Sequence, residues 1–219
     1  MKWYLDFGHG GKDPGAIGPT NLKESDTVLK IGMMVKETLE NTLEKVITTR
    51  ENDTYYSLDY RTKKANSENC DYFISIHLNS ATNKSAKGCE VWLYDENSKL
   101  ILLGNNLCDN LSTKMNTPRR GIKYSKKLAV LKNTTMPALL LEVDFISNSD
   151  VENKLRDNKY LKDISDTISS TLLSFVNKSI DDETLYRVCI GAFSNKDNAI
   201  NLKKQAIAKG FKDTYILSN

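Results

Sequence analysis

A chain of 219 residues can form one well-packed domain and a small addition, and its 39% hydrophobic and 27% charged residues exclude intrinsic disorder. The net charge of +3 is too small to indicate nucleic acid as a partner. No apolar run approaches the roughly 18 residues of a membrane-spanning helix, so no insertion into a membrane is expected.

The first expected element is a short apolar strand that contains Trp3, Tyr4 and Leu5. No hydrophobic segment of a signal peptide precedes this strand, so we expect synthesis in the cytoplasm and action outside it only after release. A loop rich in glycine and proline follows, and it contains His9. Glycines at this density allow positive φ angles and a close approach of the backbone to a bound group.

Glu24 stands at the end of this loop, where a helix is expected to begin with Ser25 or Asp26 as its N-cap. The loop and the first helical turn together orient Glu24, so its carboxylate can point back towards His9. Apolar side chains then recur at helical spacing, at Val28, Ile31, Val35, Leu39 and Leu43.

Strands and helices alternate along the rest of the first 176 residues. Strands are expected at 46–49, 72–80, 88–94, 128–131 and 137–143, and helices at 58–67, 100–115 and 160–176. This alternation predicts an α/β fold with a mostly parallel, twisted sheet that helices cover on both faces.

A second, small unit is expected at 184–219, after a polar linker at 177–183. This unit is predicted to contain a strand at 186–190, a helix at 198–209 that Gly210 ends, and a strand at 214–217. It is too small to sustain a separate core. We therefore expect it to pack on the first domain or to pair with a second copy of the chain.

The chain has only two histidines, His9 and His77, and each follows an expected buried strand. The carboxyl ends of strands in an open α/β sheet gather at one edge, so the two imidazoles can converge there. Two histidines and one glutamate are a common ligand set of catalytic zinc, which makes Glu24 the candidate third ligand. The alternative is that each histidine is a hydrogen-bonded core residue.

Glu142 lies within a strongly apolar stretch, between Leu141 and Val143. An ionised carboxylate buried there is costly unless it is paired or its pKa is raised. A raised pKa suits a general acid/base that takes a proton from water and returns it to a leaving amine. The alternative is an edge strand on which Glu142 faces solvent.

Motifs along residues 2–176 resemble the zinc-dependent N-acetylmuramoyl-L-alanine amidases, a family that includes many bacterial autolysins and phage endolysins. The matching positions are Gly8-His9-Gly10-Gly11, Asp13, Gly15-Ala16, Glu24, Thr49-Arg50, Asp53, Arg61, Ala65-Asn66, Ser75 to Ser80, Gly88, Glu90, Arg120-Gly121, Leu128, Val130-Leu131, Met136-Pro137-Ala138, Glu142, Phe145 and Ser147-Asn148.

The resemblance implies that His9, Glu24 and His77 bind one zinc ion and that Glu142 is the catalytic acid/base. The bond cut would be the amide between N-acetylmuramic acid and the L-alanine of the peptidoglycan stem peptide. Asn79 is a candidate substrate contact, with the alternative of a residue that orders a turn.

Arg120 is the second candidate substrate contact, with the alternative of a simple surface charge. The chain departs from the family at Asp144, where glycine is usual. A side chain there is expected to narrow the site or to alter substrate preference.

The C-terminal unit resembles the first half of a sporulation-related repeat (SPOR) domain, which binds peptidoglycan glycan strands. The similarity starts at 186–194 and ends at Gly210-Phe211. Such domains join two similar halves, so two chains supplying one half each would form a homodimer. The alternative is a truncated domain.

The expected function is therefore a bacteriolytic cell-wall hydrolase, an endolysin of a phage or prophage that acts on the wall after release from the host cytoplasm. One alternative is a zinc carboxypeptidase or endopeptidase that acts on the stem peptide. Another is a wall-binding protein that has lost catalysis. The complete set of His9, Glu24, His77 and Glu142 argues against the second alternative.

Overall fold

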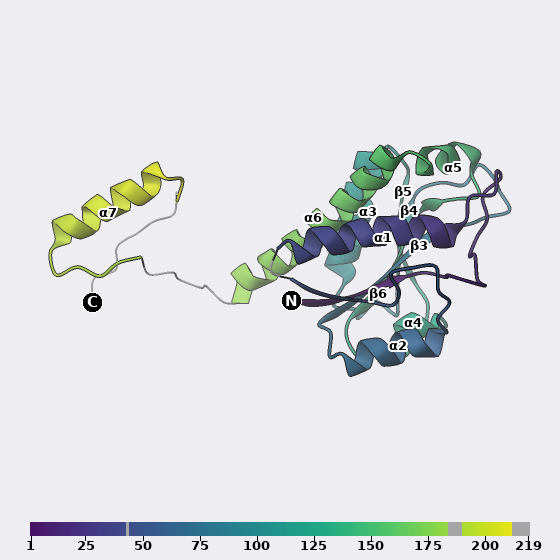
Figure 1. Cartoon of the computed structure of the whole chain (residues 1–219), viewed down its shortest axis with the longest axis horizontal. Coiled ribbons are helices and arrows are strands. Elements are labelled where there is room, and N and C mark those ends of the chain that lie inside the picture. The colour runs from purple at the N-terminus through teal and green to yellow at the C-terminus, as the bar shows by residue number, and fades with distance from the viewer. Residues whose placement is uncertain (43, 184–189, 212–219) are drawn as a thin grey trace. The chain divides into compact units, whose positions relative to one another are not determined.

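The computed structural model describes residues 1–42, 44–183 and 190–211. The chain divides into two compact units, Met1–Lys178 and Ser179–Asn219, and each is described by itself (Figure 1). The boundary falls inside the expected linker at 177–183. No helix in the described part of the chain is long and apolar enough to cross a membrane.

The described part of the first unit contains a six-stranded sheet with the order β2-β1-β3-β6-β4-β5. Neighbouring strands are parallel except for β4 and β6, which pair antiparallel. The predicted α/β class with a mostly parallel sheet is therefore confirmed. The strands are β1 (Lys2–Phe7), β2 (Lys45–Thr48), β3 (Tyr72–Asn79), β4 (Cys89–Leu93), β5 (Arg119–Tyr124) and β6 (Ala138–Phe145).

Helices cover both faces of this sheet, with α1, α3, α5 and α6 on one side and α2 and α4 on the other (Figure 1). Each face of the sheet packs in an apolar cluster, and alternate residues of β1 point to opposite faces. Trp3 and Leu5 belong to the larger cluster, whereas Tyr4 belongs to the smaller one. These helices are α1 (Glu24–Glu40), α2 (Leu58–Ser67), α3 (Ile101–Met115), α4 (Ala129–Lys132), α5 (Ser149–Leu155) and α6 (Asn158–Glu183).

The strand predicted at 128–131 is wrong, because α4 forms a short helix there. The amide of Leu131 donates to the carbonyl of Leu128, and the buried Val130 and Leu131 pack in the smaller apolar cluster with Leu140. An apolar run this short has no periodicity that separates a strand from a buried helix.

Further differences concern the start of α1 and two elements that were not expected. Helix α1 begins at Glu24 with Lys23 as its N-cap, so Ser25 and Asp26 lie in its first turn and are not the cap. Strand β5 and helix α5 were not predicted: β5 is a largely polar edge strand, and α5 is only seven residues long. Leu43, the expected end of the α1 stripe, lies outside the described residues.

Helix α6 continues to Glu183, so the expected linker at 177–183 is helical. In the second unit, α7 (Lys196–Ala208) confirms the helix predicted at 198–209, and Gly210 follows it with a φ of 100°. The expected strand at 214–217, and all of the strand at 186–190 except Ile190, lie outside the described residues.

A buried ion pair, between Asp6 of β1 and Arg61 of α2, lies beneath the glycine-rich loop. Arg61 donates to Asp6 at 2.6 Å, and the hydroxyls of Thr49 and Ser75 donate to the same carboxylate at 2.6 and 2.7 Å. The Asp6 and Arg61 side chains are only 1% and 3% exposed. Burial favours the neutral acid, but the Arg61 charge and the Thr49 hydroxyl together lower the pKa of Asp6.

Replacing Arg61 with methionine is expected to destabilise the fold by about 3–5 kcal/mol, because Asp6 would remain as a buried carboxylate without its cation. Urea unfolding of the whole chain measures this loss. Lys63→Met is the control, since Lys63 pairs with Asp59 on the same helix but is 75% exposed. Equal losses in the two variants would contradict the role of the pair.

Candidate metal centre and active site

Two buried arginines hold the loop that carries His9. Arg50 donates to the carbonyls of Phe7 at 3.0 Å and Gly8 at 2.9 Å, and Arg61 donates to those of Phe7 at 3.0 Å and His9 at 2.8 Å. His9 has a φ of 61°, a left-handed conformation that costs free energy in a residue with a side chain. The arginines stabilise this backbone and so fix the direction of the imidazole.

Glycines leave room for the ligand side chains. A Cβ atom on Gly8 would lie 2.3 Å from Cε1 of His77. A Cβ atom on Gly15 would lie 2.6 Å from the His9 ring and 2.7 Å from the Glu24 carboxylate, and Gly15 has a φ of 67°. Only glycine fits these two positions.

The carboxylate of Glu24 is the point on which both imidazoles converge. Its Oε1 atom lies 3.2 Å from Nε2 of His9 and 2.8 Å from Nδ1 of His77, and the His77 side chain comes from the end of β3. Backbone amides of Leu78 and Ala16 donate to Oε1 and Oε2 at 3.0 and 2.9 Å. Loop, helix and sheet therefore meet at one carboxylate.

The structure brings the three predicted ligands together. One ligand atom from each of His9, Glu24 and His77 lies within 4.8 Å of the others, the one such group of three metal-binding side chains in the described part of the chain. Two imidazoles and a carboxylate fit zinc, which binds nitrogen and oxygen ligands in catalytic sites and keeps a position for water. The same donors also accept other divalent ions.

The charges at this cluster are strongly coupled. Burial lowers the pKa of His9, but the hydrogen bonds and charges of Glu24 and Asp13 outweigh it and raise that pKa to about 9. The pKa of His77 is also raised, against its burial, by Glu24. The histidines in turn lower the pKa of Glu24 despite its burial. The negative charge of Glu24 thus favours the protonated imidazoles, and a bound cation would compete with their protons.

Asp13 orients the His9 ring from behind. Its Oδ2 atom lies 2.9 Å from Nδ1 of His9, and its Oδ1 atom accepts from the amide of Gly15 at 3.1 Å. The hydrogen bond between Nδ1 of His9 and Asp13 orients the ring so that its other nitrogen, Nε2, faces Glu24. Carboxylates that fix metal-binding histidines in this way raise metal affinity.

Glu142 lies on β6 in the interior of the sheet, between His77 of β3 and Glu90 of β4. This position rules out the edge strand considered as the alternative. The Oε2 atom of Glu142 is buried and has no hydrogen-bond partner among the described residues. Burial raises the pKa of Glu142 to about 7, and the charges of Glu24 and Glu90 act in the same direction although His77 opposes them. A carboxyl group that titrates near neutrality suits a general acid/base.

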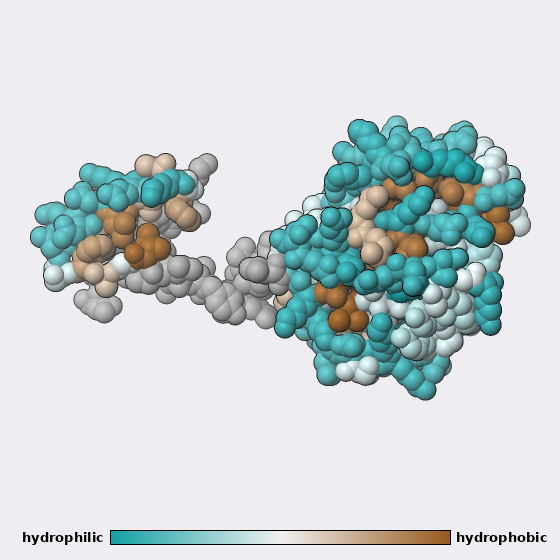
Figure 2. Space-filling view, viewed as in Figure 1, coloured by the Kyte–Doolittle hydropathy of each residue, from teal (hydrophilic) through white to brown (hydrophobic). Residues whose placement is uncertain are grey.

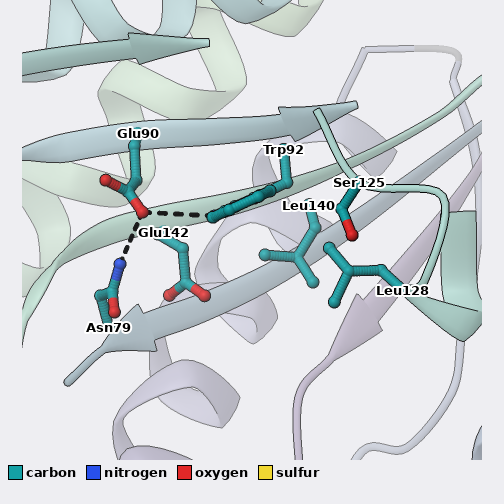
Figure 3. A pocket seen from close by; sticks show the side chains of 7 residues that line it. All are labelled: Asn79, Glu90, Trp92, Ser125, Leu128, Leu140 and Glu142. Atoms are coloured by element: carbon teal, nitrogen blue, oxygen red, sulfur yellow. Dashed lines mark hydrogen bonds between the residues drawn. The ribbon is translucent and has the colours of Figure 1, made fainter. Parts of the chain in front are cut away.

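A cavity of about 270 Å³ opens in front of Glu142 (Figure 3). Its polar wall contains Asn79 and Glu90, and the Asn79 amide donates to Glu90 at 2.8 Å. Arg120 donates to the other Glu90 oxygen at 2.6 Å, so both predicted substrate contacts are bound to one carboxylate. The complete lining is Asn79, Glu90, Trp92, Ser125, Leu128, Leu140 and Glu142.

A second cavity, of about 350 Å³, lies beside His9 and His77 and is bordered by Tyr55. Leu128 and Leu140 line both cavities, so the two adjoin at these leucines. A bound substrate could therefore occupy the cavity at His9 and His77 and, past the two leucines, the cavity at Glu142.

The sequence motifs contained Arg50, Arg61 and Glu90, but no role was predicted for any of them. Apart from the bond of Arg61 to Asp6, the hydrogen bonds of the two arginines go to backbone carbonyls, and no residue pattern encodes these contacts. Glu90 did have a signal, because it is an acidic residue inside an apolar strand, as Glu142 is. An acidic residue at such a position predicts a buried carboxylate that pairs with a polar or charged side chain.

Asp144 does not narrow the site as expected. Its side chain is buried, and its oxygens accept from the amides of Gly88 at 2.7 Å and Phe145 at 2.8 Å and from the hydroxyl of Thr117 at 2.7 Å. It lines neither cavity. Asp144 instead ties β6 to the segments that precede β4 and β5.

The family model for N-acetylmuramoyl-L-alanine amidase matches residues 4–174. The sporulation-specific N-acetylmuramoyl-L-alanine amidase of Bacillus subtilis is 34% identical over 223 residues, which cover 100% of this chain and 86% of that protein. The endolysin of Bacillus phage SPP1 is 35% identical over 182 residues, covering 80% of this chain and 65% of the endolysin.

Solved structures of amidases show the same fold. The N-acetylmuramoyl-L-alanine amidase from Clostridium difficile 630 has a TM-score of 0.76 at 30% identity, covering 80% of this chain and 96% of that one. The catalytic domain of CwlV from Bacillus (Paenibacillus) polymyxa var. colistinus has a TM-score of 0.75 at 30% identity. The match covers 81% of this chain and 99% of that domain. The fold shared with these two structures thus extends over about four fifths of this chain.

Replacing Asp13 with asparagine is expected to weaken zinc binding by about 10–100-fold, because His9 loses the carboxylate that orients its ring. Titration calorimetry measures the affinity. Asp53→Asn is the matched control: Asp53 accepts from the amide of Gly11 in the same loop at 2.7 Å but does not hydrogen-bond His9. The same affinity in both variants would contradict this role of Asp13.

Proposed function

This chain belongs to the N-acetylmuramoyl-L-alanine amidase family of peptidoglycan hydrolases, and on that premise we propose that it cleaves its substrate with one zinc ion held by His9, Glu24 and His77. The substrate bond is the amide between N-acetylmuramic acid and the L-alanine that begins the stem peptide. The observation that carries the proposal is the convergence of the three ligand atoms within 4.8 Å, beside a buried oxygen of Glu142 that has no hydrogen-bond partner in the described part of the chain.

When bound, zinc would polarise the scissile carbonyl and lower the pKa of an attacking water. Glu142 is the proposed proton carrier of the reaction. Its Oε2 atom has no donor in the described residues, so it can accept a proton from water and then return it to the amine of the departing L-alanine. A pKa of about 7 makes both transfers accessible near neutral pH.

Asn79 and Arg120 are the proposed substrate contacts. Asn79 lines the cavity in front of Glu142, and Arg120 shares the carboxylate of Glu90 with it. In these positions they would hold the substrate on the side of Glu142 that faces away from the zinc ligands.

For the second unit we propose half of a SPOR-like domain that binds the wall and pairs with a second copy of the chain. Its described part leaves Ile190, Phe193 and Ile207 exposed, and Figure 2 shows hydrophobic patches beside α7. Apolar side chains in so small a unit favour a partner that covers them.

The likeness to the endolysin of Bacillus phage SPP1 supports a phage or prophage origin. We propose that the protein reaches the wall from the host cytoplasm after another agent has opened the membrane. Peptidoglycan is the partner on which it then acts.

Digestion of isolated peptidoglycan is expected to release stem peptides with a new N-terminal L-alanine, detected by mass spectrometry. A chelator should stop the release. Glu142→Gln should lower the rate by about 10²–10⁴-fold, because its neutral amide cannot take the proton. The control is Glu40→Gln, at an exposed position on α1.

Shortened stems that remain attached to muramic acid would indicate a peptidase instead. No product from any wall, together with retained wall binding, would indicate a binding protein without catalysis. Full activity of Glu142→Gln would contradict the assigned acid/base.

The whole chain is expected to be a dimer in light scattering at micromolar concentration, and residues 1–178 alone a monomer. The reason is that each chain supplies half of the expected C-terminal fold. A monomer mass for the whole chain would contradict the pairing and favour a truncated domain.

A further inference from the structure

Glu90 lies directly beside Glu142, on the neighbouring strand. The two residues are paired in the antiparallel register of β4 and β6, and both line the cavity in front of Glu142. Directly opposed residues of neighbouring strands present their side chains on the same face of the sheet. Glu90 is nevertheless not an obvious second proton carrier, because its oxygens are already engaged.

Three donors surround the Glu90 carboxylate. Its Oε1 atom accepts from the Asn79 amide at 2.8 Å and from the Trp92 indole at 3.3 Å, contacts that Figure 3 shows. Its Oε2 atom accepts from Nε of Arg120 at 2.6 Å. A buried carboxylate with this set of donors holds each of them in a defined place.

The contacts of Arg120 fix its position but do not use all of its hydrogen-bond donors. Its guanidinium lies 4.8 Å from the centre of the Phe145 ring, and Nε is bound to Glu90. The side chain is 40% exposed, and within the described residues no hydrogen bond engages its two terminal nitrogens. That pair of nitrogens matches the two oxygens of a carboxylate.

The arginine of the adjoining cavity does not have this property. Arg61 lines the cavity beside His9, but it is 3% exposed and its nitrogens donate to Asp6 and to the carbonyls of Phe7, His9 and Tyr56. The charge of Arg61 therefore stabilises the fold. On the Glu142 side, by contrast, Arg120 has donors with which it can bind a ligand.

From this arrangement we infer that Glu90 is a positioning residue and that the Arg120 it holds selects a stem peptide with a free carboxylate next to its L-alanine. The inference deepens the proposed function and depends on it. The acidic Glu90 and Glu142 would repel such a carboxylate if Arg120 were absent or misplaced. An amide at the same place in the peptide offers Arg120 only one neutral oxygen, so it gains neither an ion pair nor a second hydrogen bond to an oxygen.

Two synthetic muramyl peptides test the inference. They differ only at the residue after L-alanine, which carries a free carboxylate in one and its amide in the other. The zinc-loaded chain is expected to show a kcat/KM about tenfold or more higher for the carboxylate peptide, mainly through KM. Arg120→Gln should bring the ratio close to one, whereas Arg120→Lys should retain part of it.

Glu90→Ala should also lower the ratio, because Arg120 then loses the contact that orients it. A merely structural role of Glu90 would reduce the rates for both peptides alike and leave the ratio unchanged, which would overturn the inference. Equal kcat/KM of the unmodified chain for the two peptides would overturn it as well. Glu90→Gln provides a second variant with nearly the original volume if Glu90→Ala does not fold.

Hydrolysis of neither peptide would contradict the proposed function instead. Calorimetric binding of the same two peptides to the zinc-loaded chain then decides the inference independently. Tighter binding of the carboxylate peptide that Arg120→Gln abolishes would support it, and equal affinities would overturn it.

Discussion

The site depends on the hydrogen bonds that two buried guanidinium groups make to the backbone of the glycine-rich loop. Arg50 and Arg61 together engage the carbonyls of Phe7, Gly8 and His9. Asp6 compensates the charge of Arg61 from below. Because His9 has a φ of 61°, the direction of its imidazole relies on this support and on the absence of a Cβ atom at Gly15.

The surroundings of Glu24 and Glu142 shift the pKa values of the two carboxyl groups in opposite directions. Glu24 receives two backbone amides and faces two imidazoles, and these contacts lower its pKa against its burial. The Oε2 atom of Glu142 has no donor among the described residues, and burial raises the pKa of Glu142 to about 7. Titratable groups whose surroundings move their pKa values apart are typical of acid/base assignments. We accordingly propose Glu24 as a ligand that stays ionised and Glu142 as the proton carrier.

Much of this arrangement could be predicted because it follows from local patterns. Strand ends placed both histidines at one edge of the sheet, and an acidic residue in an apolar strand marked Glu142. The short segment at 128–131 was predicted wrongly because its apolar run has no period, and no local pattern encodes the contacts of Arg50 with backbone carbonyls. The hydrogen bonds of Asp144 likewise join segments distant in sequence, so no local pattern predicts where its side chain lies.

The measurement that tests the central claim most directly is a crystal structure of the zinc-loaded chain, with the ion located by its anomalous signal. We expect one ion bound by one nitrogen each of His9 and His77 and one oxygen of Glu24, at roughly 2.0–2.2 Å, with Glu142 near it but not bound to it. An ion bound elsewhere, or one that takes Glu142 as a ligand in place of Glu24, would contradict the account.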